Sequence, residues 1–187
     1  MAALLEVCVD NVASALAAQR AGAARVELCD ALALGGTTPS IGMVRVVLRR
    51  LAEDAAAQGG AAPPPPPIPV HALVRPRAGD FCYSADEAEV MVADVAALRR
   101  LEEGGRRVAG VVLGALEPDG AVDVALMRRL IEAARGGGGG GGGAAAAAAA
   151  EGADAVAGPP LSVTFHRAID ASRDPLEALR ACLALRV

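Results

Sequence analysis

The chain has 187 residues, which is enough for one domain with a sizeable core and too few for two comfortable ones. Hydrophobic residues make up 53% of it but aromatic residues only 2%, so the core must consist of Ala, Val and Leu, and no aromatic platform for single-stranded nucleic acid is expected. A formal charge of −4 argues against a broad basic surface for nucleic acid, although a local arginine cluster can still hold a small anion.

The N-terminal run MAALLEVCVDN lacks the basic region of a secretory signal, and no apolar span is long enough to cross a bilayer. The four cysteines show neither CxxC spacing nor the density of a disulfide scaffold. We therefore expect a soluble protein of the cytoplasm, with no membrane partner and reduced thiols.

Short β-branched runs alternate with longer amphipathic runs along the whole chain, which predicts a parallel sheet built from βα units. In chain order we predict a strand at 4–10, a helix at 11–23, a strand at 25–30, a helix at 41–57, a strand at 68–76, a helix at 85–101, a strand at 110–116, a helix at 124–135, a strand at 161–170 and a helix from 175 to the end. Ser84 and Glu87 form a capping box, and Asp174-Pro175 marks the start of the last helix.

Two low-complexity segments interrupt this alternation, at about 58–67 and 136–158. Neither composition can bury a core, so we interpret both as insertions on the helix-to-strand side of one domain that spans residues 1–187.

The first two strands repeat a carboxylate and a thiol, in LEVCVD and RVELCD, at an interval of 21 residues. Alternate residues of a strand face opposite sides. One of the two sets of alternate residues, the apolar parity, is uniformly apolar. It comprises Leu5, Val7, Val9, Val26, Leu28, Val70, Ala72, Val74, Val163 and Phe165. The other is largely polar and comprises Glu6, Cys8, Asp10, Glu27, Cys29, His71, Leu73, Arg75, Ser162, Thr164 and His166.

A doubly wound sheet reads apolar on both faces, whereas a (β/α) barrel has helices on the outside only and a lumen on the other side. The polar parity therefore predicts a TIM-barrel type of fold, with strands in the order 1-2-3-4-5. Such a barrel needs eight βα units and this chain has five, so we expect an incomplete barrel, truncated at the C-terminus, with two open edges, poor stability alone and impaired function.

The runs LEVCVDN, RVELCDALALGG, VHALVRPRAGDFCYS, GVVLGALEPDG and LSVTFHRAID, in this order, resemble the CutC family of copper homeostasis proteins. The resemblance implies a cytoplasmic TIM barrel, often self-associated, with a role in copper handling. It also implies that Cys8 and Cys29 match the cysteines proposed to bind copper(I) in the family. Thr37 and Ile169 depart from the family pattern, which usually has Leu and Phe there.

Cys8 and Cys29 are our predicted metal ligands, because two thiolates suit copper(I). The alternative is that both are small buried hydrophobes. Glu6 and Glu27 are hard ligands, so we expect them to pair with Arg75 or a histidine instead.

A second cluster is predicted at the carboxyl ends of the third and fifth strands, where barrel chemistry is found. Its predicted ligand-binding residues are Arg75, Arg77, Asp80, Arg167 and Asp170. The catalytic candidates are His71, His166, Glu6 and Glu27. An ion-pair network that only satisfies a polar lumen is the alternative for all of them.

Two functions follow from these sites. The first is a cytosolic protein that binds copper(I) through barrel cysteines. The second is a barrel enzyme acting on a small anionic metabolite, with His/Glu acid–base residues and arginine anchors. The sequence does not specify a substrate for the second.

Overall fold

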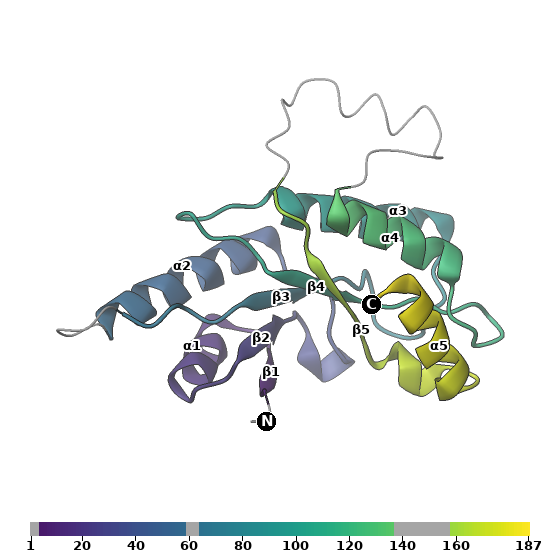
Figure 1. Ribbon diagram of the computed structural model, residues 1–187, viewed down its shortest axis with the longest axis horizontal. Coiled ribbons are helices and arrows are strands. Elements are labelled where there is room, and N and C mark those ends of the chain that lie inside the picture. The colour runs from purple at the N-terminus through teal and green to yellow at the C-terminus, as the bar shows by residue number, and fades with distance from the viewer. Residues whose placement is uncertain (1–3, 59–63, 137–157) are drawn as a thin grey trace, which may run out of the picture.

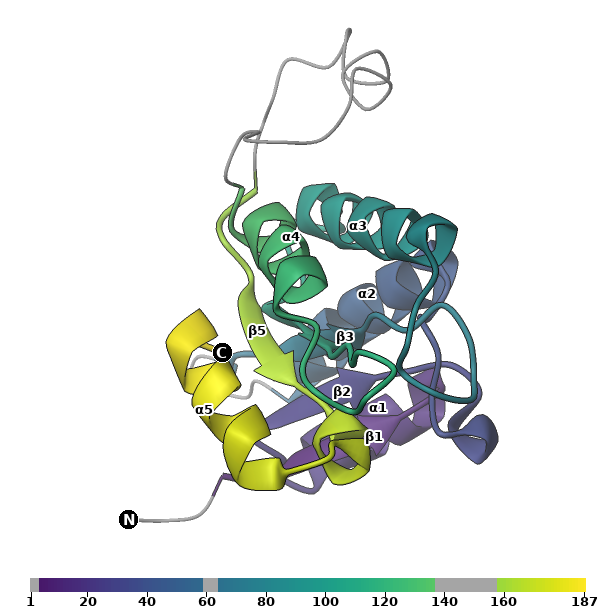
Figure 2. The ribbon, with the colours of Figure 1, turned by 90° about the vertical axis from the view of Figure 1, so that its right-hand side faces the viewer.

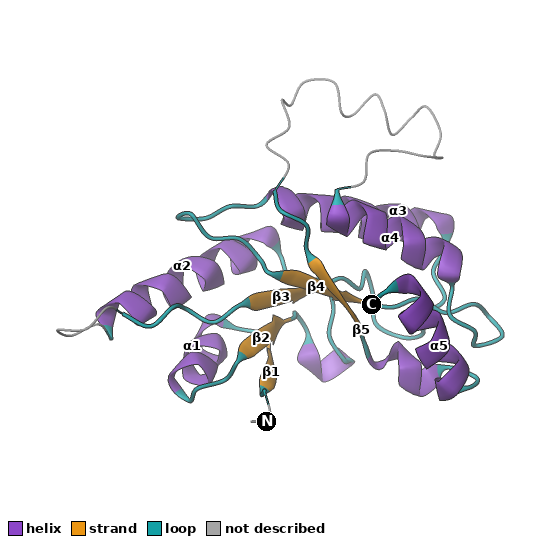
Figure 3. Cartoon of the chain, in the orientation of Figure 1, coloured by secondary structure: helices purple, strands orange, loops and turns teal. Residues whose placement is uncertain are grey.

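The computed structural model of the chain describes residues 4–58, 64–136 and 158–187. Within them, β-strands and α-helices alternate (Figures 1 and 3). In chain order they are β1 (Glu6–Val9), α1 (Val12–Arg20), β2 (Arg25–Leu28), α2 (Ile41–Ala57), β3 (Val70–Leu73), α3 (Ala85–Arg100), β4 (Gly110–Leu113), α4 (Val124–Arg135), β5 (Ser162–Phe165) and α5 (Pro175–Leu185). Residues 59–63 of the first predicted low-complexity insertion and residues 137–157 of the second lie outside the described residues.

The strands form one parallel sheet in the order β1-β2-β3-β4-β5, which confirms the prediction. Figure 2 shows the sheet curving, with α1 to α4 on the same side of it. The apolar parity of the strands faces these helices in the main core. That core includes Val26, Leu28, Val70, Ala72, Val111 and Leu113 from strands, and Val47, Met91 and Leu130 from helices.

The helices begin where side chains satisfy their free backbone N–H groups. The predicted capping box starts α3: the Glu87 N–H donates to Ser84 Oγ at 3.3 Å, and the Ser84 N–H donates to Glu87 Oε2 at 2.8 Å. Asp174 caps α5 by accepting from the Leu176 N–H at 2.8 Å, with Pro175 as the first helical residue. Both predicted helix starts are therefore confirmed.

All five predicted strands are longer than the observed ones, and the fifth, 161–170, has the largest excess. The sheet ladder ends at Phe165, and the chain turns into the 3₁₀ helix η2 (Arg167–Ala171). The cause is local, because His166 Nδ1 accepts the Ala168 N–H at 3.2 Å and so satisfies a donor that would otherwise need a strand partner.

The chain leaves α4 and returns to β5 at neighbouring points. The Leu161 N–H donates to Ala134 O at 2.9 Å, and Arg99 Nη1 donates to Gly158 O at 3.2 Å. The same Arg99 guanidinium lies against Gly136. Residues 137–157 therefore connect two positions that are held side by side.

β1 and β5 are the outer strands of the sheet among the described residues. Beyond β5, α5 packs against α4 and exposes Leu176, Leu179 and Leu183 along one helical face. A helix long and apolar enough to cross a membrane does not occur in the ranges described.

Candidate functional site

The register of the strands assembles one row of lumen residues. Cys8 lies opposite Glu27, Glu27 opposite His71, His71 opposite Gly110, and Gly110 opposite Ser162. Since alternate residues share a face, the lumen side of the sheet carries this row across all five strands.

Gly110 allows the polar groups on either side of it to meet. A Cβ at this position would lie 2.8 Å from His71 Cε1 and 2.8 Å from the Ser162 carbonyl oxygen. Without that methyl group, Ser162 Oγ lies 3.3 Å from His71 Nε2. Burial, and then the nearby Arg25, lower the pKa of His71, so its ring is neutral at neutral pH.

Glu27 stands between the two predicted metal ligands. The Cys8 thiol donates to Glu27 Oε2 at 3.3 Å, and the Cys29 thiol lies 3.7 Å from Glu27 Oε1. Cys8 is exposed on the outer strand, whereas Cys29 is buried beside Leu73 and Val112.

The carboxylate and the burial of the site keep both thiols protonated at neutral pH. Burial, followed by the charge of Glu27, raises the pKa of Cys8 to about 11. The same two causes raise the pKa of Cys29. Burial also raises the pKa of Glu27 itself. The site is therefore a pair of thiols with a proton acceptor between them.

The ladder differs from the 21-residue repeat of the sequence. Glu6 lies opposite Arg25 and Cys8 opposite Glu27, an offset of 19 residues, so Cys29 lies beyond Cys8 along the strand direction on the same face. Cys8 lies on β1, as predicted, whereas Cys29 directly follows the last residue of the adjacent strand β2, so the two cysteines are staggered.

The prediction that Glu6 and Glu27 pair with Arg75 or a histidine was wrong. Glu6 pairs with Arg25, and Glu27 contacts the thiols. Sequence reasoning missed Arg25, although it has the same parity as Glu27 and therefore belongs to the lumen face.

Arg75 lies at the carboxyl end of β3 and is 3% exposed. Its Nη1 donates to the carbonyls of Gly35 at 3.2 Å and Gly36 at 2.8 Å, and its Nη2 donates to the Gly79 carbonyl at 2.7 Å. The guanidinium also lies over the Phe81 ring, 4.9 Å from its centroid. Arg75 thus fastens two loops to the mouth of the barrel.

His166 is 8% exposed at the end of β5, and its ring centroid lies 5.0 Å from that of Phe81. Burial, followed by the charge of Arg75, lowers the pKa of His166 to about 4. Because Nδ1 accepts from Ala168, the proton of the neutral ring is on Nε2. His166 therefore presents a hydrogen-bond donor.

The other predicted ligand-binding residues divide into two groups. Arg77 pairs with Glu87 of α3 at 2.5 Å and with Asp80 of its own loop at 2.9 Å, so its charge is neutralised locally. Arg167 and Asp170 lie exposed on η2.

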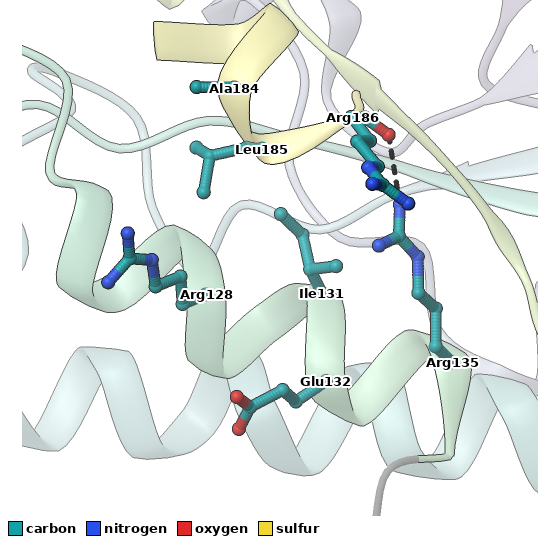
Figure 4. A pocket seen from close by; sticks show the side chains of 7 residues that line it. All are labelled: Arg128, Ile131, Glu132, Arg135, Ala184, Leu185 and Arg186. Carbon is teal, nitrogen blue, oxygen red and sulfur yellow. Dashed lines mark hydrogen bonds between the residues drawn. The ribbon is translucent and has the colours of Figure 1, made fainter.

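No group of three or more His, Cys, Asp or Glu residues in the described part of the chain is arranged to hold a metal ion. All four cysteines are free thiols, with Cys82 half-buried in a loop and Cys182 buried on α5. A surface hollow between α4 and the end of α5, where Arg135 donates to the Arg186 carbonyl at 2.9 Å, contains none of the candidate residues (Figure 4).

The chain is similar to known proteins over nearly its whole length. Residues 3–140 match the model of the CutC family. A CutC family protein of Mesorhizobium japonicum is 43% identical over 98% of this chain and 54% of its own length. One from Xylella fastidiosa is 45% identical over 97% of this chain and 51% of its own length. The chain thus spans about half the length of these curated relatives.

A solved structure, of a CutC protein assigned to copper homeostasis in Streptococcus agalactiae, superposes with a TM-score of 0.71 at 28% identity. The match covers 98% of this chain and 69% of that one. The five parallel strands accordingly belong to a TIM-barrel type of fold. Together with the family match over residues 3–140, this similarity establishes that the chain belongs to the CutC family.

Proposed function

We propose that this chain binds copper(I) through Cys8 and Cys29 and handles it in the cytoplasm. The observation that carries the proposal is the contact of both thiols with one carboxylate, Glu27, on the lumen face. Membership of a copper homeostasis family supports copper as the cargo.

The donor set fits copper(I) better than harder or higher-coordinate ions. Thiolates are soft ligands that select copper(I), whereas zinc sites usually use four ligands. Within the residues that the structure describes, no three-ligand group competes with the two thiols. The chemistry of this site therefore suits a metal held by two sulfur atoms.

Binding requires the loss of two thiol protons, because the thiolate is the ligand. Glu27 touches both thiols, and its raised pKa makes it a better proton acceptor than an ordinary carboxylate. We infer that Glu27 takes up one of these protons as copper arrives and passes it to solvent. Copper affinity should then increase with pH.

Titration with copper(I) under strictly reducing conditions, against a competing chromophoric chelator, tests the proposal. The wild-type chain should bind one equivalent, and both Cys8→Ser and Cys29→Ser should weaken binding at least a hundredfold. Cys82→Ser is the matched control and should bind like the wild type. Failure of the wild-type chain to compete for copper, or equal losses in the control, would contradict the assignment.

The second candidate function is an enzyme that acts on a small anionic metabolite. Arg75, whose guanidinium donates to backbone carbonyls at the barrel mouth, favours an anionic ligand there. A base role for His166 has less support, because its Nδ1 already accepts a backbone hydrogen bond. Self-association stays a prediction, as does the assignment of residues 1–187 to a single partial barrel domain.

A further inference from the structure

Two arginine guanidiniums approach each other at the barrel mouth. A Cβ on Gly35 would lie 3.3 Å from Arg75 Nη1 and 2.8 Å from Arg167 Nη1, so both groups lie against the same point of the backbone. Every hydrogen bond of the Arg75 guanidinium goes to a backbone carbonyl. Like charges are therefore held together at the carboxyl ends of β3 and β5.

No carboxylate balances this pair. The ion pairs found in the described ranges include neither Arg75 nor Arg167, and Asp170 on the same 3₁₀ helix makes none with Arg167. This is unusual, because a buried charge such as that of Arg75 is normally paired. Arg77, in contrast to Arg75 and Arg167, pairs with two carboxylates.

Two buried polar atoms without partners lie close to this pair. Arg75 Nε and His166 Nε2 both lack a hydrogen-bond partner among the described residues. They are neighbours, since Phe81 contacts both: the Arg75 guanidinium lies 4.9 Å from its ring centroid, and the centroid of the His166 ring lies 5.0 Å from it. Native proteins rarely leave such donors unsatisfied, so their grouping beside unbalanced positive charge indicates a missing negative ligand.

We propose that Arg75, Arg167 and His166 form a binding site for the phosphate group of a small metabolite at the mouth of the barrel. Two unbalanced guanidiniums match the two negative charges of a phosphate monoester, whereas a carboxylate carries only one. The donors come from separate elements, β3, η2 and the end of β5, and this suits a tetrahedral group better than a planar one. Phosphate sites of complete barrels lie at the same end of the strands.

The proposed site uses neither thiol, but Gly36 lies beside the Cys29 side chain, so phosphate binding is tested without copper. Inorganic phosphate is titrated into ¹⁵N-labelled, metal-free protein at constant ionic strength, and the amide shifts of Gly35 and Gly36 are followed by NMR. We expect saturable shifts at both amides. Acetate at the same ionic strength should bind at least tenfold more weakly.

Arg167→Gln is the decisive variant, because Arg167 is exposed and its replacement should not disturb folding. It should weaken phosphate binding at least tenfold. Arg173→Gln is the matched control: Arg173 is also exposed but pairs with Asp119 and with Glu177 at 2.5 Å, so phosphate binding should be unchanged. Absence of saturable shifts, equal effects of the two variants, or acetate binding as tightly as phosphate would overturn the proposal.

Discussion

Replacing Glu27 with glutamine should make the Cys8 thiol easier to deprotonate and faster to alkylate. Glutamine keeps the size of the side chain and a hydrogen-bond acceptor but removes the charge 3.3 Å from Cys8 Sγ. Cys8 lies on an outer strand, and with the dielectric of water as the limiting value two charges at this distance repel by at least roughly 1 kcal/mol. The pKa of Cys8, raised to about 11 in the wild type, should therefore fall by about one unit in the variant.

This shift sets the expected alkylation rate. A fall of about one unit gives roughly ten times more thiolate at pH 8, while the intrinsic nucleophilicity of the thiolate falls roughly threefold. Iodoacetamide should thus modify Cys8 roughly threefold faster in Glu27→Gln than in the wild type.

Mass spectrometry of tryptic peptides measures the rate at each cysteine separately. The peptide 1–20 contains Cys8 as its only cysteine, and the peptide 78–99 contains only Cys82, which serves as an internal control. The Cys82 rate should be the same in both proteins, because Glu27 is not among the charges that act on it. An unchanged or slower Cys8 rate would refute the view that Glu27 holds the thiol in its protonated form.

Three further predictions concern stability. Ser84→Ala removes the α3 cap and should cost about 1 kcal/mol, seen as a melting temperature lower by roughly 2–4 °C; an unchanged value would count against the cap. Gly114→Ala places a Cβ 2.6 Å from His166 Nδ1 and should destabilise by about 1–3 kcal/mol in chemical denaturation. Gly42→Ala, whose Cβ would make only an ordinary contact of 3.8 Å with Ser40 Oγ, is its control and should not destabilise. Finally, the pKa of His166 is lowered from 6.5 to about 4 on folding, so its unfolded form binds a proton first, and wild-type stability should fall as pH drops through this window. His166→Gln should show a shallower fall over the same range, and equal pH slopes for the two proteins would contradict this.

The elements and the faces of the sheet could be predicted because both depend on local patterns. The bounds of α2 (Ile41–Ala57) and α4 (Val124–Arg135) coincide with the predicted ones, since each helix has an amphipathic run and a clear capping residue. The alternation of polar and apolar residues identified the lumen face, because side chains of a strand point to opposite sides whatever the strand's partner.

The contacts within the lumen could not be predicted in the same way. The sequence repeat aligns Cys8 with Cys29, but the strands pair with an offset of 19 residues, which brings Glu27 opposite Cys8. The same register also brings Glu6 into an ion pair with Arg25. The register between strands depends on long-range packing. Side-chain contacts between strands therefore cannot be predicted from the sequence, even when every strand is located correctly.

The contacts of Arg99 have a consequence for how the length of the chain between Gly136 and Gly158 can vary. The Arg99 guanidinium donates to the Gly158 carbonyl and lies against Gly136, and the Leu161 N–H donates to the Ala134 carbonyl. These contacts hold the two ends together without any contribution from the residues that join them. For a flexible connection, doubling its length would cost only about 0.6 kcal/mol in closure entropy. Insertions and deletions between 136 and 158 are therefore close to neutral for the barrel, and a reporter domain with adjacent termini can be inserted there without disturbing the lumen.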